Sequence, residues 1–232
     1  MKKRVRIFAI HGAGMNAGVF AGLMPHLLDH VLDPVSLPGH KDKETPLHDI
    51  AAMADFVRKK IVGDAPRSNV LLGHSMGALV ALEAASCPSV AGVILLGAAG
   101  KMPVNVELLQ MAHDDPQKAQ ELVIKWSVFK EHPQAAAVKI VLSALMREPL
   151  KTAIYRDLKA CNTYQGARKI TKPSLVIAGE ADKMTLPAAA KDLAATLDGG
   201  YVAIPLCGHM MMLERPLETA AEIRKFIGAL PH

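Results

Sequence analysis

Aromatic residues are scarce in this chain of 232 residues, in which Phe, Tyr and Trp together make up 4%. Proteins that bind single-stranded nucleic acids stack bases on aromatic side chains, so this scarcity argues against a nucleic-acid partner. The net charge of +5 does not alter that expectation, because the basic residues are spread along the chain and indicate a solvated surface. At most, the charge indicates a mild preference for anionic substrates.

Long hydrophobic runs are also missing. No stretch approaches the roughly 20 apolar residues that cross a membrane, so we expect no membrane partner. The basic first residues resemble a secretory signal, but Arg6 interrupts it and the apolar run ends at His11. Three cysteines show neither metal nor redox spacing, which favours reduced thiols and a cytoplasmic protein. No metal-binding or nucleotide-binding pattern occurs, so we expect neither a metal nor another cofactor.

Half of the residues are hydrophobic, which suffices for the core of one large domain. Continuous apolar runs indicate strands that are covered on both faces, at Val5–Ile10, Val31–Ser36, Val70–Leu72, Ala91–Leu96, Ser174–Ala178 and Tyr201–Ile204. Helical patterns lie between them, at Gly18–Leu28, Pro46–Ile61, Gly77–Ala85, Pro187–Leu197 and Leu217–Leu230. This alternation predicts an α/β fold with a mostly parallel sheet between helices.

One region interrupts the alternation. Between residues 100 and 172 no strand pattern occurs, and four segments have helical patterns: Val106–Ala112, Pro116–Val128, Pro133–Arg147 and Leu150–Tyr164. Proline at the start of two of them is typical of a first helical turn. We therefore predict a core domain of residues 1–100 and 172–232, with residues 101–171 inserted as a helical cap. Such an insertion lies over the carboxyl edge of the sheet, where ligands bind in open α/β folds.

The segment Gly73-His74-Ser75-Met76-Gly77 is the most informative motif of the chain. It has the pattern Gly-x-Ser-x-Gly, and it lies between a predicted strand and a predicted helix. In that context the serine occupies a sharp turn, and its hydroxyl is exposed above the edge of the sheet. A serine hydroxyl must lose its proton as it attacks, so a nucleophilic Ser75 needs a neighbouring base.

Motifs at other strand ends accompany this serine: His11–Gly14, Leu37–His40, Gly179–Asp182 and Gly208-His209. In this order they resemble the α/β-hydrolases, of the small esterase or lipase-like kind with a helical cap, over nearly the whole chain. Many members begin with an antiparallel hairpin, but only four residues precede the first strand here. We therefore expect a trimmed sheet of six strands, all parallel.

The resemblance implies a Ser-His-Asp triad with Ser75 as nucleophile, His209 as base and Asp182 as the acid that orients the histidine. Two other carboxylates are rivals for the last role: we expect Glu180 to face solvent and Asp198 to end a helix.

The resemblance also implies an oxyanion hole made of two backbone N–H groups, those of Met76 and Ala13. We expect His11 to hold the loop that carries Ala13, and we do not expect it to be catalytic. Four residues near the predicted site loops and cap are candidates for the substrate pocket: Met15, Trp126, Met184 and Met210. Trp126 and Phe129 are equally well explained as part of the core of the cap.

Three functions are compatible with these residues. The leading interpretation is hydrolysis of a carboxylic ester with a small to medium apolar acyl part, through an acyl-enzyme. Similar enzymes use the same triad to cleave carbon–carbon bonds or to eliminate pyruvate, and they usually bind anionic substrates with arginines, here Arg147, Arg156 or Arg168. The third interpretation is a non-catalytic ligand receptor on the same fold. The acyl chain length, the leaving group and the oligomeric state stay open.

Overall fold

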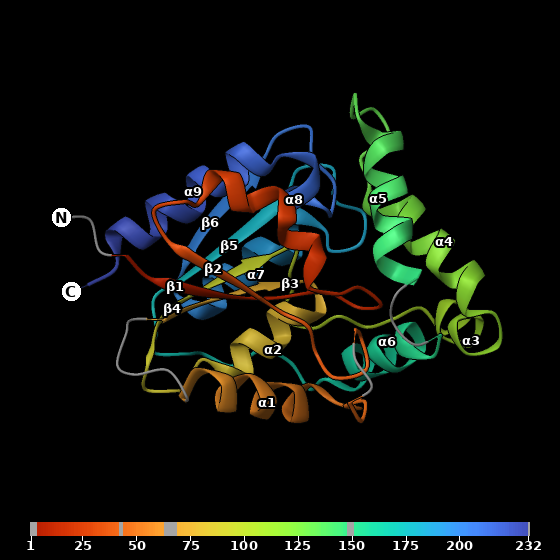
Figure 1. Cartoon of the computed structure of the whole chain (residues 1–232), viewed down its shortest axis with the longest axis horizontal. Coiled ribbons are helices and arrows are strands. Elements are labelled where there is room, and N and C mark those ends of the chain that lie inside the picture. The colour runs from red at the N-terminus through yellow and green to blue at the C-terminus, as the bar shows by residue number, and fades with distance from the viewer. Residues whose placement is uncertain (1–3, 42–43, 63–68, 148–150, 232) are drawn as a thin grey trace.

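The computed structural model describes residues 4–41, 44–62, 69–147 and 151–231. At its centre is a six-stranded sheet in which every strand pair is parallel. The strands are β1 (Arg6–Ile10), β2 (Val31–Val35), β3 (Asn69–His74), β4 (Val90–Leu96), β5 (Ser174–Gly179) and β6 (Gly200–Ile204). Their order is β2-β1-β3-β4-β5-β6 (Figure 1), so the predicted six-stranded parallel sheet is confirmed.

The accessibility of the strands follows their position in the sheet. β3 is buried along its whole length, as expected for a central strand with helices on both faces. β2 and β6 are the two edge strands, and most of their residues are more accessible. Pro34 fits within β2 because an edge strand does not need every backbone N–H for its ladder. At this edge Asp33 of β2 accepts a hydrogen bond of 2.9 Å from Nε of Arg6.

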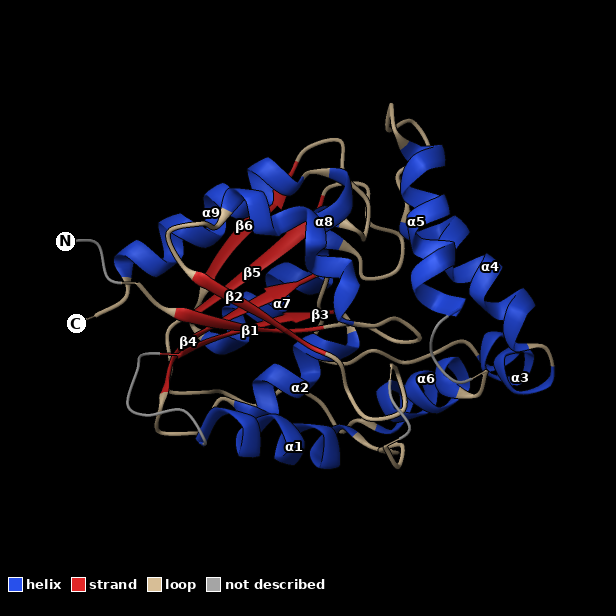
Figure 2. Cartoon of the chain, viewed as in Figure 1, coloured by secondary structure: helices blue, strands red, loops and turns tan. Residues whose placement is uncertain are grey.

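Helices cover both faces of the sheet (Figure 2). One face carries α1 (Ile50–Val62) and α2 (Met76–Ala84), which pack against each other. The other face carries the 3₁₀ segment η1 (Ala17–His26) and α9 (Pro216–Ala229), which also contact one another. α7 (Pro187–Leu197) packs on β5 and β6. The result is a layered α/β core in which the ends of the central strands point toward one end of the molecule.

At that end lie four helices, called the cap helices from here on: α3 (Val106–Asp114), α4 (Pro116–Ser127), α5 (Ala135–Arg147) and α6 (Ala153–Thr163). Among the described residues between β4 and β5 there is no strand. Asn105 caps α3, and Asp115 caps α4 by accepting the N–H of Lys118, so the predicted start at Pro116 is correct. The division into a core and a cap of residues 101–171 remains our prediction.

Most predicted helices differ from the structure by one or two residues, and four differ at their start or in their type. α6, predicted from Leu150, begins at Ala153, and Leu150 lies outside the described residues. Residues 46–49 are not helical, because α1 begins only at Ile50. α5 begins at Ala135, two residues after the proline that was expected to start it. The segment predicted as a helix at residues 18–28 forms the 3₁₀ segment η1, which contains Pro25. The short helix α8 (Met211–Glu214) was not predicted, because four residues carry no helical periodicity.

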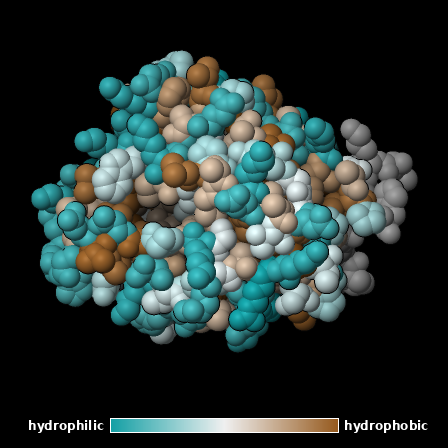
Figure 3. All heavy atoms as spheres, turned by 180° about the vertical axis from the view of Figure 1, so that it is seen from behind, coloured by the Kyte–Doolittle hydropathy of each residue, from teal (hydrophilic) through white to brown (hydrophobic). Residues whose placement is uncertain are grey.

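The surface agrees with a solvated exterior. On the face turned away from the viewer of Figure 1, hydrophilic residues predominate and hydrophobic ones form small, separate groups (Figure 3). Within the described residues, no helix is both long and apolar enough to cross a membrane. All three cysteines are buried and unpaired.

Candidate active site

The Gly-x-Ser-x-Gly segment forms a tight turn between β3 and α2. Ser75 has a φ of +52° and a ψ of −118°, a conformation that residues other than glycine rarely adopt. A Cβ atom on Gly73 would lie 2.3 Å from the carbonyl oxygen of Gly77, and one on Gly77 would lie 2.1 Å from that of Ile10. Both glycines are therefore required by close backbone contacts, and the turn leaves Ser75 half-buried at the end of β3.

His209 lies in the loop between β6 and α8, and its ring is almost completely buried. Nδ1 lies 2.8 Å from Oδ2 of Asp182, which follows β5. The backbone of the histidine is also held, because its N–H donates to the carbonyl of Ser127 and its carbonyl accepts from Nε2 of His74. The structure thus brings together the histidine and the carboxylate that the sequence predicts to be partners.

Asp182 is surrounded by hydrogen-bond donors. Oδ1 accepts the backbone N–H groups of Met184 and Thr185, at 2.8 and 3.0 Å, and Oδ2 accepts the Thr185 hydroxyl at 2.8 Å. Burial alone would raise the pKa of Asp182, but the neighbouring His209 and the Thr185 donors hold it below its ordinary value. Asp182 is therefore an ionised acceptor, which favours the tautomer of His209 with its proton on Nδ1.

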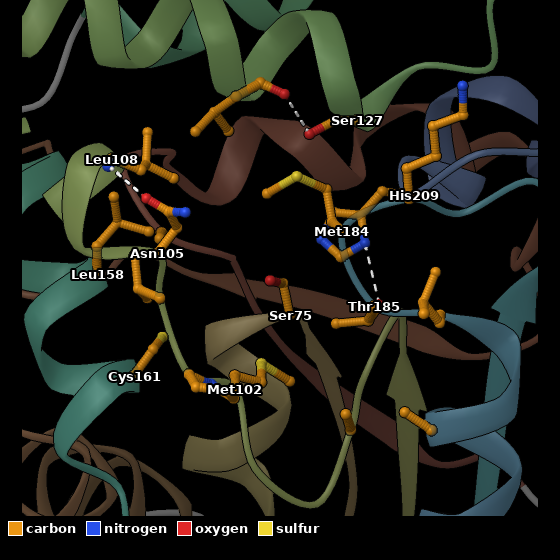
Figure 4. A pocket seen from close by; sticks show the side chains of 18 of the residues that line it. Ser75, Met102, Asn105, Leu108, Ser127, Leu158, Cys161, Met184, Thr185 and His209 are labelled. Atoms are coloured by element: carbon orange, nitrogen blue, oxygen red, sulfur yellow. Dashed lines mark hydrogen bonds between the residues drawn. The ribbon is translucent and has the colours of Figure 1, made fainter. Parts of the chain in front are cut away.

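This tautomer leaves the lone pair of Nε2 free to take a proton. Figure 4 shows the His209 ring and Ser75 at the same cavity, with Thr185 beside the ring. Within the described part of the chain the Ser75 hydroxyl has no hydrogen-bond partner. Catalytic serine–histidine hydrogen bonds often form only when substrate is bound, so this arrangement is compatible with Ser75 as a nucleophile.

Two backbone N–H groups near Ser75 are candidates for an oxyanion hole. Met76 is the first residue of α2, where N–H groups have no partner inside the helix and the helix dipole is positive. Ala13 lies in the loop after β1 and lines the same cavity as Ser75. Neither N–H group donates to an acceptor among the described residues. His11 does not line this cavity, and its ring bridges the Gly12 carbonyl and the N–H of Leu37.

A cavity of about 350 Å³ adjoins Ser75 and His209. Most of its wall is apolar and comes from the cap helices and from the loops after β4 and β5, including Met102, Leu108, Val123, Leu158, Met184 and Leu186. Of the predicted pocket residues, Met15 and Met184 lie on this wall. Met210 is completely buried and Trp126 is 39% exposed, and neither lies on the wall. The rotation of α4 turns Trp126 toward solvent, which helical spacing alone does not reveal.

The basic groups on the cavity wall are not arginines. Among the described lining residues, Lys101 and Lys183 are the only lysines or arginines. Arg147 and Arg168 line separate hollows elsewhere on the molecule. Arg156 is buried and contacts His40 and Asp157. None of the three arginines considered for anionic substrates lies on the wall of the Ser75 cavity.

The structure also reveals polar residues around the site that the sequence did not indicate. Thr185 donates to Asp182 and lies 3.3 Å from Nδ1 of His209. Asp157 and Glu214 are buried carboxylates that accept backbone N–H groups from the loops next to Ala13 and His209. No motif marks them, because the partner of Asp157 lies 143 positions away and Glu214 itself belongs to the unpredicted helix α8. Among the described residues no group of three or more His, Cys, Asp or Glu side chains could hold a metal ion.

Comparisons with known proteins agree with the fold. The profile of the alpha/beta hydrolase family matches residues 7–222. A pimeloyl-[acyl-carrier protein] methyl ester esterase of Stenotrophomonas maltophilia (strain R551-3) is 32% identical over an alignment of 224 residues, and the match covers 84% of this chain and 82% of the relative. An esterase from Exiguobacterium antarcticum superposes with a TM-score of 0.87 at 18% identity, covering 99% of this chain and 94% of that one. A lipase-esterase related protein from Clostridium acetobutylicum ATCC 824 superposes with a TM-score of 0.82 at 18% identity, covering 97% and 95%.

The fold, the order of the motifs and these matches define the class of this protein. The chain belongs to the alpha/beta hydrolase family. The predicted family and fold class are confirmed. The esterase names of two of these relatives agree with the prediction of a hydrolase that acts on ester bonds.

Proposed function

We propose that this protein hydrolyses carboxylic esters with a small to medium apolar acyl group, through an acyl-enzyme on Ser75. One observation carries the proposal: a serine in a strained strand–helix turn opens into the same apolar cavity as the His209–Asp182 pair. Ser75 follows β3, and Asp182 and His209 follow β5 and β6, so three strand ends supply the proposed triad.

In the first step, Oγ of Ser75 attacks the ester carbonyl carbon while Nε2 of His209 takes the hydroxyl proton. The carbonyl oxygen becomes negatively charged and accepts hydrogen bonds from the N–H groups of Ala13 and Met76. The imidazolium that forms is stabilised by Asp182, whose carboxylate remains ionised. Donors and charges that are held in position before the reaction need little reorganisation as the charge develops.

The tetrahedral intermediate then collapses. His209 gives its proton to the leaving alkoxide, the alcohol departs, and the acyl group stays on Ser75 as an ester. A water molecule repeats the sequence in reverse: it loses a proton to Nε2 and attacks the acyl carbon, and the carboxylic acid is released as Ser75 regains its proton. No step requires a cofactor.

The wall of the cavity supports an apolar acyl group. Leucine, valine and methionine side chains dominate it, and methionine adapts to acyl groups of different shape. A volume of about 350 Å³ lies in the range of small-molecule pockets and accommodates an acyl chain of modest length. The relative in Stenotrophomonas maltophilia is named for a methyl ester, which supports an ester bond as the point of cleavage here.

The second enzymatic interpretation receives less support. Carbon–carbon hydrolysis or pyruvate elimination would favour an arginine facing Ser75, and none of the three candidate arginines lines the cavity. The receptor interpretation requires binding without turnover, whereas the proposed nucleophile and the His209–Asp182 pair adjoin one cavity, which favours turnover. Both alternatives are outcomes of the experiment that tests the proposal.

The test is turnover of a p-nitrophenyl ester series from acetate to decanoate, with Ser75→Ala as control. We expect hydrolysis that disappears in the variant, with the best chain length reporting the size of the cavity. If no ester is hydrolysed while a fluorophosphonate still labels Ser75, the nucleophile is active and another reaction of the triad is indicated. If neither occurs, the receptor interpretation replaces the proposal.

A further inference from the structure

Two carboxylates are buried where the cap helices meet the loops of the site. Asp157, on α6, is completely buried, and its Oδ2 accepts the backbone N–H of Gly14 at 2.8 Å. Gly14 directly follows Ala13, whose N–H we assign to the oxyanion hole. The contact joins residues that are 143 positions apart, so it fixes the loop after β1 to the cap helices.

The loop at Gly14 fits closely against the cap helices. Gly14 has a φ of +68°, and a Cβ atom there would lie 2.9 Å from Cδ1 of Ile154 and 3.1 Å from Cε of Met146. The backbone of the loop therefore packs directly on α5 and α6, and a small movement of these helices would displace it. The Asp157 hydrogen bond adds a directional contact to this packing.

Charge holds Asp157 in place. The same Oδ2 lies 2.7 Å from Nε2 of His40, and Oδ1 faces Nε and Nη2 of Arg156 at 3.3 and 3.2 Å. Burial alone would raise the pKa of Asp157, but His40, Arg156 and the Gly14 N–H lower it below its ordinary value. The ionised carboxylate thus joins α6 to the loops after β1 and β2.

Glu214 likewise fixes the loop that carries His209 between β6 and α8, called the histidine loop from here on. This residue ends α8 and is 4% exposed. Its Oε2 accepts the N–H groups of Phe129 and Gly208, at 2.9 and 3.1 Å, and its Oε1 accepts that of Met210 at 3.1 Å. Gly208 and Met210 flank His209, whereas Phe129 follows the end of α4. One carboxylate therefore binds both sides of the histidine and the end of a cap helix.

The Glu214 carboxylate has no cationic partner within ion-pair distance among the described residues. Its two oxygens accept three backbone N–H groups, and a carboxylate can do this because both of its oxygens are acceptors. The His209 N–H donates to Ser127 at 2.8 Å, which gives α4 a second contact with the same loop. The orientation of His209 is thus tied to the end of α4.

We propose that Asp157 and Glu214 are positioning residues. Asp157 fastens the cap helices to the loop after β1 that carries Ala13, and Glu214 fastens them to the histidine loop. They act on the reaction through Ala13 and His209, and neither touches the substrate. The inference rests on the proposed function, because it assigns those two residues a part in ester hydrolysis. Displacement of a catalytic group by about 1 Å costs on the order of a hundredfold in rate, so loosening either loop lowers kcat.

The test variants are Asp157→Asn and Glu214→Gln, which keep size and remove charge. In Glu214→Gln the amide oxygen can accept the N–H groups of Phe129 and Gly208. The amide NH₂ then faces the N–H of Met210, so two donors meet and the Met210 N–H loses its acceptor. In Asp157→Asn, either Gly14 or Arg156 loses its acceptor in the same way. We expect kcat for a short p-nitrophenyl ester to fall about tenfold or more, with KM changed less than about threefold.

Tyr164→Phe is the matched control. The Tyr164 hydroxyl donates to Glu83 at 2.9 Å and ties the end of α6 to α2, without contact to either catalytic loop. This variant should lower the melting temperature and leave kcat unchanged. If the two carboxylate variants likewise lose only thermal stability, or raise KM at unchanged kcat, the proposal is wrong.

Two further measurements complete the test. If the charge-removing variants do not fold, Asp157→Glu and Glu214→Asp keep the charge but move the carboxylate, and they should fold with reduced kcat. If these variants fold with normal kcat, or fail to fold as well, the positioning role is refuted. If the unaltered protein hydrolyses no ester, the rate of fluorophosphonate labelling of Ser75 replaces kcat. A labelling rate that falls in both variants supports positioning even though ester hydrolysis has failed.

Discussion

Replacing Asp182 by asparagine tests the geometry of the site most directly, because the structure dictates how the new amide must lie. Oδ1 of Asp182 accepts two backbone N–H groups, from Met184 and Thr185, and these cannot become acceptors. The amide oxygen of an asparagine must take this position. Its NH₂ group then occupies the place of Oδ2, facing the Thr185 hydroxyl and Nδ1 of His209.

This orientation reverses the hydrogen bond to the histidine. The amide donates to Nδ1, so the proton of His209 moves to Nε2, the nitrogen that has to accept the proton of Ser75. The Thr185 hydroxyl can rotate to accept, and the fold therefore tolerates the change. Loss of the correct tautomer in a serine triad lowers kcat by about 10⁴, and we expect an effect of that order here.

The assay is hydrolysis of p-nitrophenyl butyrate under saturating conditions, together with circular dichroism to verify the fold. Asp198→Asn is the matched control, since Asp198 is an exposed helix-end residue with a φ of +55° and no contact with the site. Asparagine is tolerated in that conformation, so kcat should not change. A folded Asp182→Asn variant that keeps kcat within about tenfold would refute the assignment of Asp182 as the orienting carboxylate.

Three further predictions follow from named contacts. The pKa of Asp182 is lowered in the folded protein, so this carboxylate contributes fully to stability above its unfolded pKa, near 3.8. The contribution is lost as the pH falls through the lower folded pKa. The free energy of unfolding in urea should therefore differ less between about pH 6 and about pH 3 in Asp182→Asn than in the unaltered protein. Gly77→Ala places a Cβ atom 2.1 Å from the Ile10 carbonyl oxygen, and it should lower the free energy of unfolding by about 3 kcal/mol and abolish activity. Gly228→Ala meets open space in α9 and should raise the free energy of unfolding by up to about 1 kcal/mol. Equal effects of the two variants in urea unfolding would contradict this reasoning. Leu158→Ala enlarges the cavity and should shift the ester series toward longer chains, while Leu142→Ala, buried in α5 away from the cavity wall, should cost about 2–5 kcal/mol without that shift.

The elements that the sequence predicts well are those with local signals. The predicted strands agree with the structure to within two residues at either end. A strand of a parallel sheet is a short apolar run that can be recognised without knowledge of its neighbours in the fold. The start of α4 was predicted because Asp115 and Pro116 form a local cap. By contrast, η1 and the start of α1 were predicted incorrectly, because apolar spacing cannot distinguish an α-helix from looser turns.

The pocket shows where such signals end. Met15 and Met184 follow strand ends and reach the cavity wall, as their position suggested. Trp126 does not, because the face that α4 turns inward depends on packing against α3, α5 and α6. The sequence shows which residues share one face of a helix. Which way that face points depends on how the helix packs in the folded protein.

The sequence alone determined the parallel sheet, the serine turn and the order of the candidate triad, since each depends on a short segment at a strand end and parallel strands end at one edge. Only the tertiary structure decided how the cap helices are joined to that edge. Asp157 and Gly14 are 143 positions apart, and Glu214 meets Phe129 across 85. A buried carboxylate is stable only where several donors converge, and the sequence does not show which donors the fold will bring together.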